Sequence, residues 1–202
     1  MKLLILDNYD SFTYNLVQYV REWPGLEIAV HRNDAIGLEA VAAYDSIILS
    51  PGPGLPSEAG IMPALLERFG DKKPILGVCL GHQAIGEVFG ARLVNLHRVY
   101  HGIATPIWRT TPEDALLNDL PSPFVAGRYH SWIIADDHFP ESLVVTARDE
   151  QGTIMAMRHH QHPVFGLQFH PESIMTEAGQ NILHNFLQQS RNYTDNTVYP
   201  DP

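Results

Sequence analysis

The sequence predicts an α/β fold, with an open, mostly parallel central sheet that is flanked by helices and has an additional antiparallel portion. Two observations predict the parallel part: short, nearly continuous apolar runs alternate with segments of helical periodicity, and turn residues follow each run. Beyond Gly90, closely spaced short strands replace this pattern and predict the antiparallel part. No repeat or linker divides the chain. We therefore expect one domain over residues 1–190 and a mobile polar tail over 191–202.

Each element of the first half follows from its local pattern. The first apolar run ends at Asp7 and is typical of a strand buried on both faces. Asp10 or Ser11 can cap the helix that follows, whose apolar side chains share one face as far as the Pro24-Gly25 stop. The remaining elements expected in this half are strands at 27–31, 46–50 and 74–76, and helices at 38–43, 59–69 and 84–89.

The second half is predicted to consist of short strands and one long helix. That helix carries Ile182, Leu183, Phe186 and Leu187 on a single face, and the polar tail follows it. The expected strands lie at 92–96, 98–100, 105–108, 124–132, 143–147, 154–157 and 164–169, with a helical turn at 113–120 and the last helix at 177–189.

Composition excludes several classes of function. The net charge of −10 argues against binding to a nucleic-acid backbone, which draws its affinity from clustered Lys and Arg. The first apolar run is too short for a signal peptide, and no run is long enough to cross a membrane. The single cysteine excludes an internal disulfide, and a reactive thiol needs reducing surroundings. We expect a cytoplasmic protein whose partners include no nucleic acid and no membrane.

The single cysteine stands in a glycine-flanked turn between a buried strand and a helix. Gly77 and Gly81 enclose Cys79 in the pattern Gly-x-Cys-x-Gly, the thiol counterpart of the nucleophile elbow. A helix N-terminus favours the thiolate over the thiol, and the Leu80 N–H would point at an oxyanion formed on a carbonyl that the sulfur attacks. The alternative is that Cys79 is a small buried apolar residue, as most single cysteines are.

A second loop follows the predicted strand at 46–50. Pro51 and Pro53 stiffen it, while Gly52 and Gly54 expose backbone N–H groups that could supply a second oxyanion donor. An ordinary tight turn is the alternative. The loop is not of the phosphate-binding type, because no Gly-Lys-Ser/Thr follows it.

A base and an orienting group follow the last predicted strand. A cysteine nucleophile needs a group that takes its proton and a third group that orients the base. His170 and Glu172 are of the right types, and Pro171 fixes the backbone between them. A surface His and Glu after a strand is the alternative, which the elbow makes less favourable.

Eleven histidines are present, and three of them are clustered. His159, His160 and His162 have no second cysteine or carboxylate in their pattern, so we expect a solvated turn there and predict no metal site.

Several segments together resemble a known family. Residues 77–83 and 168–173, which contain Cys79, His170 and Glu172, look like the signature segments of the class I, or triad, glutamine amidotransferases. Residues 6–16, 50–54 and 58–60 resemble the branch of this family that serves chorismate-using synthases. The likeness extends from Leu3 to about Leu187, and its motifs are long and collectively specific.

The resemblance implies a reaction and a site. Cys79 would attack the side-chain amide carbon of L-glutamine, His170 would relay a proton to the departing ammonia, and Glu172 would orient His170. Backbone N–H groups of Gly52 and Leu80 would form the oxyanion hole. The glutamine-binding residues that the resemblance implies are Gly52, Pro53, Gly54, Gln83, Ser131 and Trp132.

Two positions depart from the pattern of the family. Trp132 stands after Ser131, where the family usually has Leu, and Ile103 stands after Gly102, where it usually has Lys. If only the backbone at residue 132 contacts glutamine, specificity should survive the bulkier side chain. Ile103 lies outside the triad, so we expect a changed partner contact rather than changed chemistry.

The resemblance also implies a partner. A chain of this length uses all its elements for the amidotransferase fold, so a large synthase subunit would bind chorismate and carry magnesium, and this chain would need no cofactor. The sequence leaves open whether the product of that synthase is anthranilate, aminodeoxychorismate or both. Two further alternatives are a cysteine hydrolase of γ-glutamyl peptides that acts alone, and a regulatory subunit whose triad is vestigial.

Overall fold

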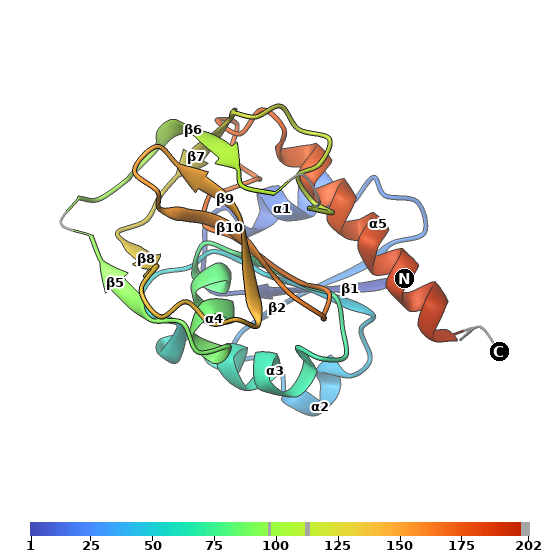
Figure 1. Ribbon diagram of the computed structural model, residues 1–202. Helices are drawn as coiled ribbons and strands as arrows, with labels where there is room; N and C mark the ends of the chain where they lie inside the picture. The colour runs from blue at the N-terminus through green and yellow to red at the C-terminus, as the bar shows by residue number, and fades with distance from the viewer. Residues whose placement is uncertain (97, 112–113, 199–202) are drawn as a thin grey trace.

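In the described part of the chain, nine strands of the computed structural model form one central sheet, and helices cover both of its faces (Figure 1). The structure describes residues 1–96, 98–111 and 114–198. The strand order is β2-β1-β3-β4-β11-β10-β9-β6-β7, and β5 and β8 pair separately. The predicted fold class is confirmed, since a parallel part continues into an antiparallel part.

Five strands, mostly buried apolar runs, make the parallel part. They are β1 (Lys2–Asp7), β2 (Glu27–Arg32), β3 (Ser46–Leu49), β4 (Ile75–Val78) and β11 (Val164–Leu167). β11 comes from far along the chain and lies between β4 and the antiparallel strands. Because β3, β4 and β11 are adjacent and parallel, the loops at their carboxyl ends meet at one edge of the sheet.

Four further strands make the antiparallel part, and two more form a small separate ribbon. In the main sheet they are β10 (Ile154–His159), β9 (Leu143–Asp149), β6 (Ile103–Arg109) and β7 (Phe124–Arg128); the ribbon pairs β5 (Leu93–Asn95) with β8 (Trp132–Ile134). A bridge joins Gly127 of β7 to His170, just beyond β11. The chain after β7 therefore passes beside the carboxyl edge of the parallel strands.

Alternate side chains of the strands pack against two different layers of helices. α1 (Thr13–Val20) and α5 (Gly179–Val198) share one core with Leu3 and Ile5, whereas α3 (Met62–Phe69) and α4 (Leu80–Val88) share the other with Leu4 and Leu6. The shorter α2 (Leu38–Val41) and a 3-10 turn at Pro56–Glu58 complete the connections. No helix within the described ranges combines the length and apolar character needed to cross a membrane.

Two strand predictions are wrong because tertiary contacts replace strand pairing. Residues 98–100 form no strand; instead the Tyr100 N–H donates to the His130 carbonyl, and the two rings stack. The run at 124–132 is broken at residues 129–131, so that β7 and β8 belong to different sheets.

The structure also changes two predictions about helices. The expected helical turn at 113–120 begins outside the described residues, and 115–119 form turns whose N–H groups at Leu116 and Leu117 bond to Asp114 Oδ1. α5 continues to Val198, past the expected end at residue 189, so residues 191–198 of the expected tail are helical. Residues 199–202 of that tail lie outside the described residues.

Candidate active site

Cys79 lies in a strained turn where β4 passes directly into α4. Its φ of 51° and ψ of −97° are unusual for a residue with a side chain and store about 1–3 kcal/mol of strain. The Cys79 N–H donates to the Leu167 carbonyl (2.7 Å), and the Gln83 N–H donates to the Cys79 carbonyl (3.0 Å). β11 and α4 thus hold the strained turn from both sides, and the thiol is buried at the start of the helix.

The glycine after the elbow permits close packing of α4 on the sheet. A Cβ atom at Gly81 would lie only 2.7 Å from both the Cβ and the carbonyl oxygen of Leu49 in β3. The first N–H groups of α4, including that of Leu80, have no carbonyl within the helix to bond. The predicted elbow, with a thiol at a helix N-terminus packed against a strand, is confirmed.

His170 and Glu172 form a buried pair in the loop after β11. The distance from His170 Nδ1 to Glu172 Oε1 is 2.6 Å, and both side chains are almost inaccessible to solvent. Since a carboxylate only accepts, Nδ1 carries the proton of this bond, and Nε2 is left without a hydrogen-bond partner. Thr176 Oγ1 donates to the His170 carbonyl (2.6 Å), which fixes the loop.

The thiol and the imidazole interact although 91 residues separate them in the sequence. Burial alone would lower the pKa of His170, but the nearby Cys79 sulfur and the Glu172 carboxylate together hold this pKa well above its ordinary value. The imidazolium is therefore favoured beside the sulfur. The structure thus brings Cys79, His170 and Glu172 together at one edge of the sheet, as the sequence predicted.

Gly52 lies on the opposite side of the elbow from the His170 loop. A Cβ atom there would be 2.5 Å from the Asn8 carbonyl oxygen and 3.0 Å from Leu80 Cδ2. Asn8 is fixed in turn by Ser50, whose carbonyl accepts a bond from Asn8 Nδ2 (2.8 Å). The glycine therefore lets the loop after β3 approach Leu80, which places the two predicted oxyanion residues side by side.

Gln83 and the Ser131-Trp132 segment form a third side of the site. Gln83 Nε2 donates to the Trp132 carbonyl (3.0 Å) and lies 3.4 Å from Gln168 Oε1. The contact uses the backbone of Trp132 and not its indole ring. The departure from Leu at this position is therefore compatible with the contact to Gln83.

Pro53 and Gly54 are less closely associated with the thiol. They are exposed, and Pro53 lines a pocket of about 300 Å³ together with Leu80, Tyr9 and Glu58. Gly54 has a φ of 77° and faces the Glu58 carboxylate. Pro53 therefore lies near Leu80, whereas the neighbour that the structure gives for Gly54 is Glu58.

Sequence reasoning missed two buried polar residues of this site. Gln168 Nε2 donates to Cys79 Sγ at 3.7 Å, and His130 Nδ1 lies 3.0 Å from the Trp132 carbonyl. Gln168 belongs to the segment at 168–173 that carries the family resemblance, whereas His130 lies outside the segments named for it. A search for polar residues that flank the predicted triad could have found Gln168, but His130 is recognisable only once the chain is folded.

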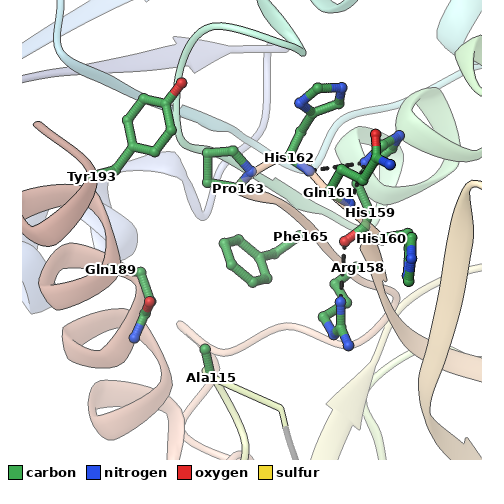
Figure 2. Close-up of a pocket in the computed structure, with 10 residues that line it drawn as sticks. All are labelled: Ala115, Arg158, His159, His160, Gln161, His162, Pro163, Phe165, Gln189 and Tyr193. Carbon is green, nitrogen blue, oxygen red and sulfur yellow. Dashed lines mark hydrogen bonds between the residues drawn. The ribbon is translucent and has the colours of Figure 1, made fainter. Parts of the chain in front are cut away.

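The histidine cluster lies in a different part of the molecule. A pocket of about 340 Å³ lies beside α5 and is lined by His159, His160 and His162 and by no residue of the predicted site; Figure 2 shows its lining residues. His159 ends β10 and is buried rather than solvated, and its Nδ1 accepts bonds from the N–H groups of Gln161 and His162, so that the bend predicted as a turn begins after it, at His160. Within the described parts of the chain, no cluster of three or more His, Cys, Asp or Glu side chains could hold a metal ion.

The fold and the site define a class of protein: an α/β protein with a buried cysteine, histidine and glutamate at the carboxyl ends of adjacent parallel strands. The family model described as glutamine amidotransferase class-I matches residues 4–190. The chain belongs to this family.

Relatives and a solved structure agree with this assignment. Anthranilate synthase component 2 of Thermus thermophilus is 49% identical over 93% of this chain and 92% of its own length. Aminodeoxychorismate/anthranilate synthase component 2 of Bacillus subtilis is 46% identical over 94% of this chain and 97% of its own length. The bifunctional protein TrpGD of Thermotoga maritima is 46% identical over 92% of this chain, which spans 32% of that longer protein. A solved structure from Thermoplasma acidophilum, named for a GMP synthase subunit, has a TM-score of 0.88 at 25% identity and 98% coverage of both chains.

Proposed function

We propose that this chain hydrolyses L-glutamine and delivers the ammonia to a chorismate-using synthase subunit, as the glutaminase subunit of an anthranilate synthase. The observation that carries the proposal is the buried His170–Glu172 pair, in which His170 Nε2 has no hydrogen-bond partner and the nearby Cys79 sulfur helps to raise the pKa of His170. Relatives along nearly their whole length carry the name anthranilate synthase component 2, which supports the assignment of the synthase.

In the first step, the Cys79 thiolate forms a bond to the side-chain amide carbon of glutamine. The carbonyl oxygen becomes an oxyanion, and the C–N bond breaks as His170 gives its proton to the leaving ammonia. Water then attacks the glutamyl thioester, loses a proton to His170 and releases glutamate and the thiolate. Glu172 keeps Nδ1 protonated and directs Nε2 towards the reacting atoms, so this chain's chemistry needs no metal or cofactor, and magnesium belongs to the chorismate site of the partner.

The oxyanion would receive hydrogen bonds from the backbone N–H groups of Leu80 and Gly52. Two features support this role: the unpaired N–H groups at the start of α4, and the close approach of Gly52 to Leu80 that the missing Cβ allows. The loss of one such donor costs about 2.7–4 kcal/mol in other enzymes.

Gln83 would bind the α-ammonium group of glutamine. Its Nε2 is directed at the Trp132 carbonyl and at Gln168 Oε1, so its free polar atom is the acceptor Oε1. An acceptor suits an ammonium group and would repel a carboxylate. The α-carboxylate is left to backbone N–H groups, for which the Ser131-Trp132 segment and the loop of Gly52, Pro53 and Gly54 are the candidates.

The synthase subunit would cover the edge of the sheet that carries the site. Large apolar side chains are exposed in the loops and in the first turn of α1 beside this edge, and Ile174, two residues after Glu172, is 92% exposed. Such side chains are typical of a surface that a partner buries. Those that we assign to the interface are Tyr9, Tyr14, Val99 and Ile174. Covering the cleft would keep the released ammonia from being protonated in water. A catalytic thiol stays reduced in a reducing compartment such as the cytoplasm, where we place the protein.

The decisive experiment is Cys79→Ser in the complex with the synthase. Glutamine-dependent synthesis should be abolished, while synthesis from added ammonia should remain near the wild-type rate. Ala64→Ser, on α3, is a control for the introduced hydroxyl and should preserve both activities. Loss of both activities in Cys79→Ser would indicate that this residue is structural and would contradict the proposal.

A shared or folate-directed role is the second candidate function, because the Bacillus subtilis relative is named for both aminodeoxychorismate and anthranilate synthases. Reconstitution with each type of large subunit distinguishes the products. Glutaminase assays with and without a large subunit identify a hydrolase that acts alone, because it reaches its full rate without a partner. A regulatory subunit with a vestigial triad would not be labelled at Cys79 by an electrophilic glutamine analogue.

A further inference from the structure

A buried ion pair lies behind the glutamine site, in the antiparallel part of the sheet. Arg128 Nη1 donates to Asp149 Oδ2 at 2.6 Å, and both side chains are inaccessible to solvent. The Tyr100 ring lies 3.7 Å from the Arg128 guanidinium carbon and holds it by a cation–π contact. Asp149 Oδ1 in turn accepts N–H bonds from the turn at Gln151 and Thr153, so the guanidinium has a fixed position.

The guanidinium determines which nitrogen of His130 carries a proton. Arg128 Nε donates to His130 Nε2 at 3.2 Å. Because a guanidinium can only donate, Nε2 must be a bare acceptor, and the proton of the neutral ring must sit on Nδ1. Burial first, and then the positive charge of Arg128, lowers the pKa of His130 to about 3, so the ring stays neutral at physiological pH.

The protonated nitrogen is directed at the glutamine site. His130 Nδ1 lies 3.0 Å from the Trp132 carbonyl oxygen, the same atom that accepts from Gln83 Nε2. Gln83 Nε2 also donates to Gln168 Oε1, and Gln168 Nε2 donates to Cys79 Sγ. A continuous series of buried polar contacts therefore joins the Arg128–Asp149 pair to the nucleophile. The opposite tautomer of His130 would set a lone pair against the Trp132 carbonyl and break this series.

We propose that His130 is a positioning residue, held by Arg128 in its Nδ1–H tautomer, which fixes the Trp132 carbonyl and hence the Gln83 amide that receives glutamine. This inference rests on the proposed function, because it assigns a task within the glutamine site. It goes beyond that function in giving the buried Arg128–Asp149 pair a role in substrate affinity. His130 touches no reacting atom, so its effect is on binding and not on the chemical step.

Two isosteric variants of the full chain separate positioning from structural support. In His130→Asn, the amide nitrogen can occupy the place of Nδ1 and donate to the Trp132 carbonyl, while the bond from Arg128 is lost. In His130→Gln, the amide oxygen can accept from Arg128, while the donor to Trp132 is lost. His184→Leu, on α5, is a matched control that removes a half-buried imidazole elsewhere.

The readout is labelling of Cys79 by a diazoketone analogue of glutamine, compared with labelling by iodoacetamide. For His130→Gln we expect the inhibition constant of the analogue to rise about tenfold, the effect of one lost hydrogen bond, with the maximal inactivation rate and the iodoacetamide rate within about twofold. For His130→Asn we expect the affinity to stay within about threefold of wild type, while the urea midpoint falls. The control should retain wild-type labelling.

Equal effects of the two variants on affinity, or none, would overturn the inference. A second measurement needs no variant to fold: nitrogen NMR of the histidine-labelled wild-type chain should show His130 with a protonated Nδ1 and a bare Nε2, and the reverse tautomer would overturn the inference. If the analogue fails to label the wild-type chain, the proposed function itself fails. Normal wild-type labelling with an unaffected Gln variant refutes only the role of His130.

Discussion

Replacing Gly81 by Ala tests how closely the elbow depends on the packing of α4 against β3. The new Cβ would lie 2.7 Å from the Cβ and the carbonyl oxygen of Leu49, against about 3.4 Å for ordinary contact, so the start of the helix must retreat by about 0.7 Å. Overpacking of this kind costs about 1–3 kcal/mol, and the better helix propensity of Ala returns up to about 1 kcal/mol. We therefore expect a net loss of up to about 3 kcal/mol in the free energy of unfolding.

Activity should fall further than stability. The retreat carries Leu80 and the Cys79 turn away from the loop of Gly52, and a misplacement near 1 Å costs about 100-fold in rate. We expect glutaminase kcat/KM to drop about 10- to 100-fold in Gly81→Ala. Gly37→Ala is the matched control, because nothing lies within 4 Å of its new Cβ and its φ is −88°. Wild-type kcat/KM in Gly81→Ala, with stability like that of the control, would refute the reasoning.

Three further predictions concern the same site. Glu172→Gln removes the charge that supports the His170 imidazolium, so the pKa of His170 should fall. Glutaminase kcat should drop about 10- to 150-fold, as expected for the loss of a hydrogen bond to a charged group, and an unchanged kcat would contradict this prediction. The pKa of His170 is raised on folding, so the stability that its imidazolium contributes is complete below about pH 6.5 and is lost as the pH rises through the raised pKa. The urea midpoint of wild type should therefore exceed that of His170→Gln by an amount that shrinks over this pH range. A difference that grows with pH would contradict the raised pKa. Gly52→Ala brings a Cβ to 2.5 Å from the Asn8 carbonyl oxygen, so glutaminase kcat should fall at least about tenfold while the iodoacetamide rate of Cys79 persists; equal loss of both would argue against an oxyanion role.

The sequence predicted the parallel part of the fold well because local pattern and burial agree there. The runs of β1, β3, β4 and β11 are apolar at almost every position, and their neighbours bury both faces. The antiparallel half was harder. The run at 124–132 reads as a single strand, yet it turns at residues 129–131 because Tyr129 packs on His170 and His130 on Tyr100. Such contacts join distant segments and leave no local signal.

The same division applies to the candidate site. Cys79, His170 and Glu172 follow strands, so their types and positions could be recognised locally. His130 and Arg128 could not be recognised in this way, since their roles depend on a ring and a guanidinium that meet only when β7 turns towards β8. The glutamine-binding roles of Pro53 and Gly54 were inferred from their family alone, and the structure places Pro53 in a pocket with Leu80.

The position of β11 in the middle of the sheet has a consequence for when the site can form during synthesis of the chain. β4 carries the thiol, but the Cys79 N–H is held by Leu167, and the base follows three residues later. A ribosome must therefore release the polypeptide beyond Glu172 before the elbow can close. A nascent or prematurely terminated chain that lacks the segment after Leu167 therefore has the cysteine without the base.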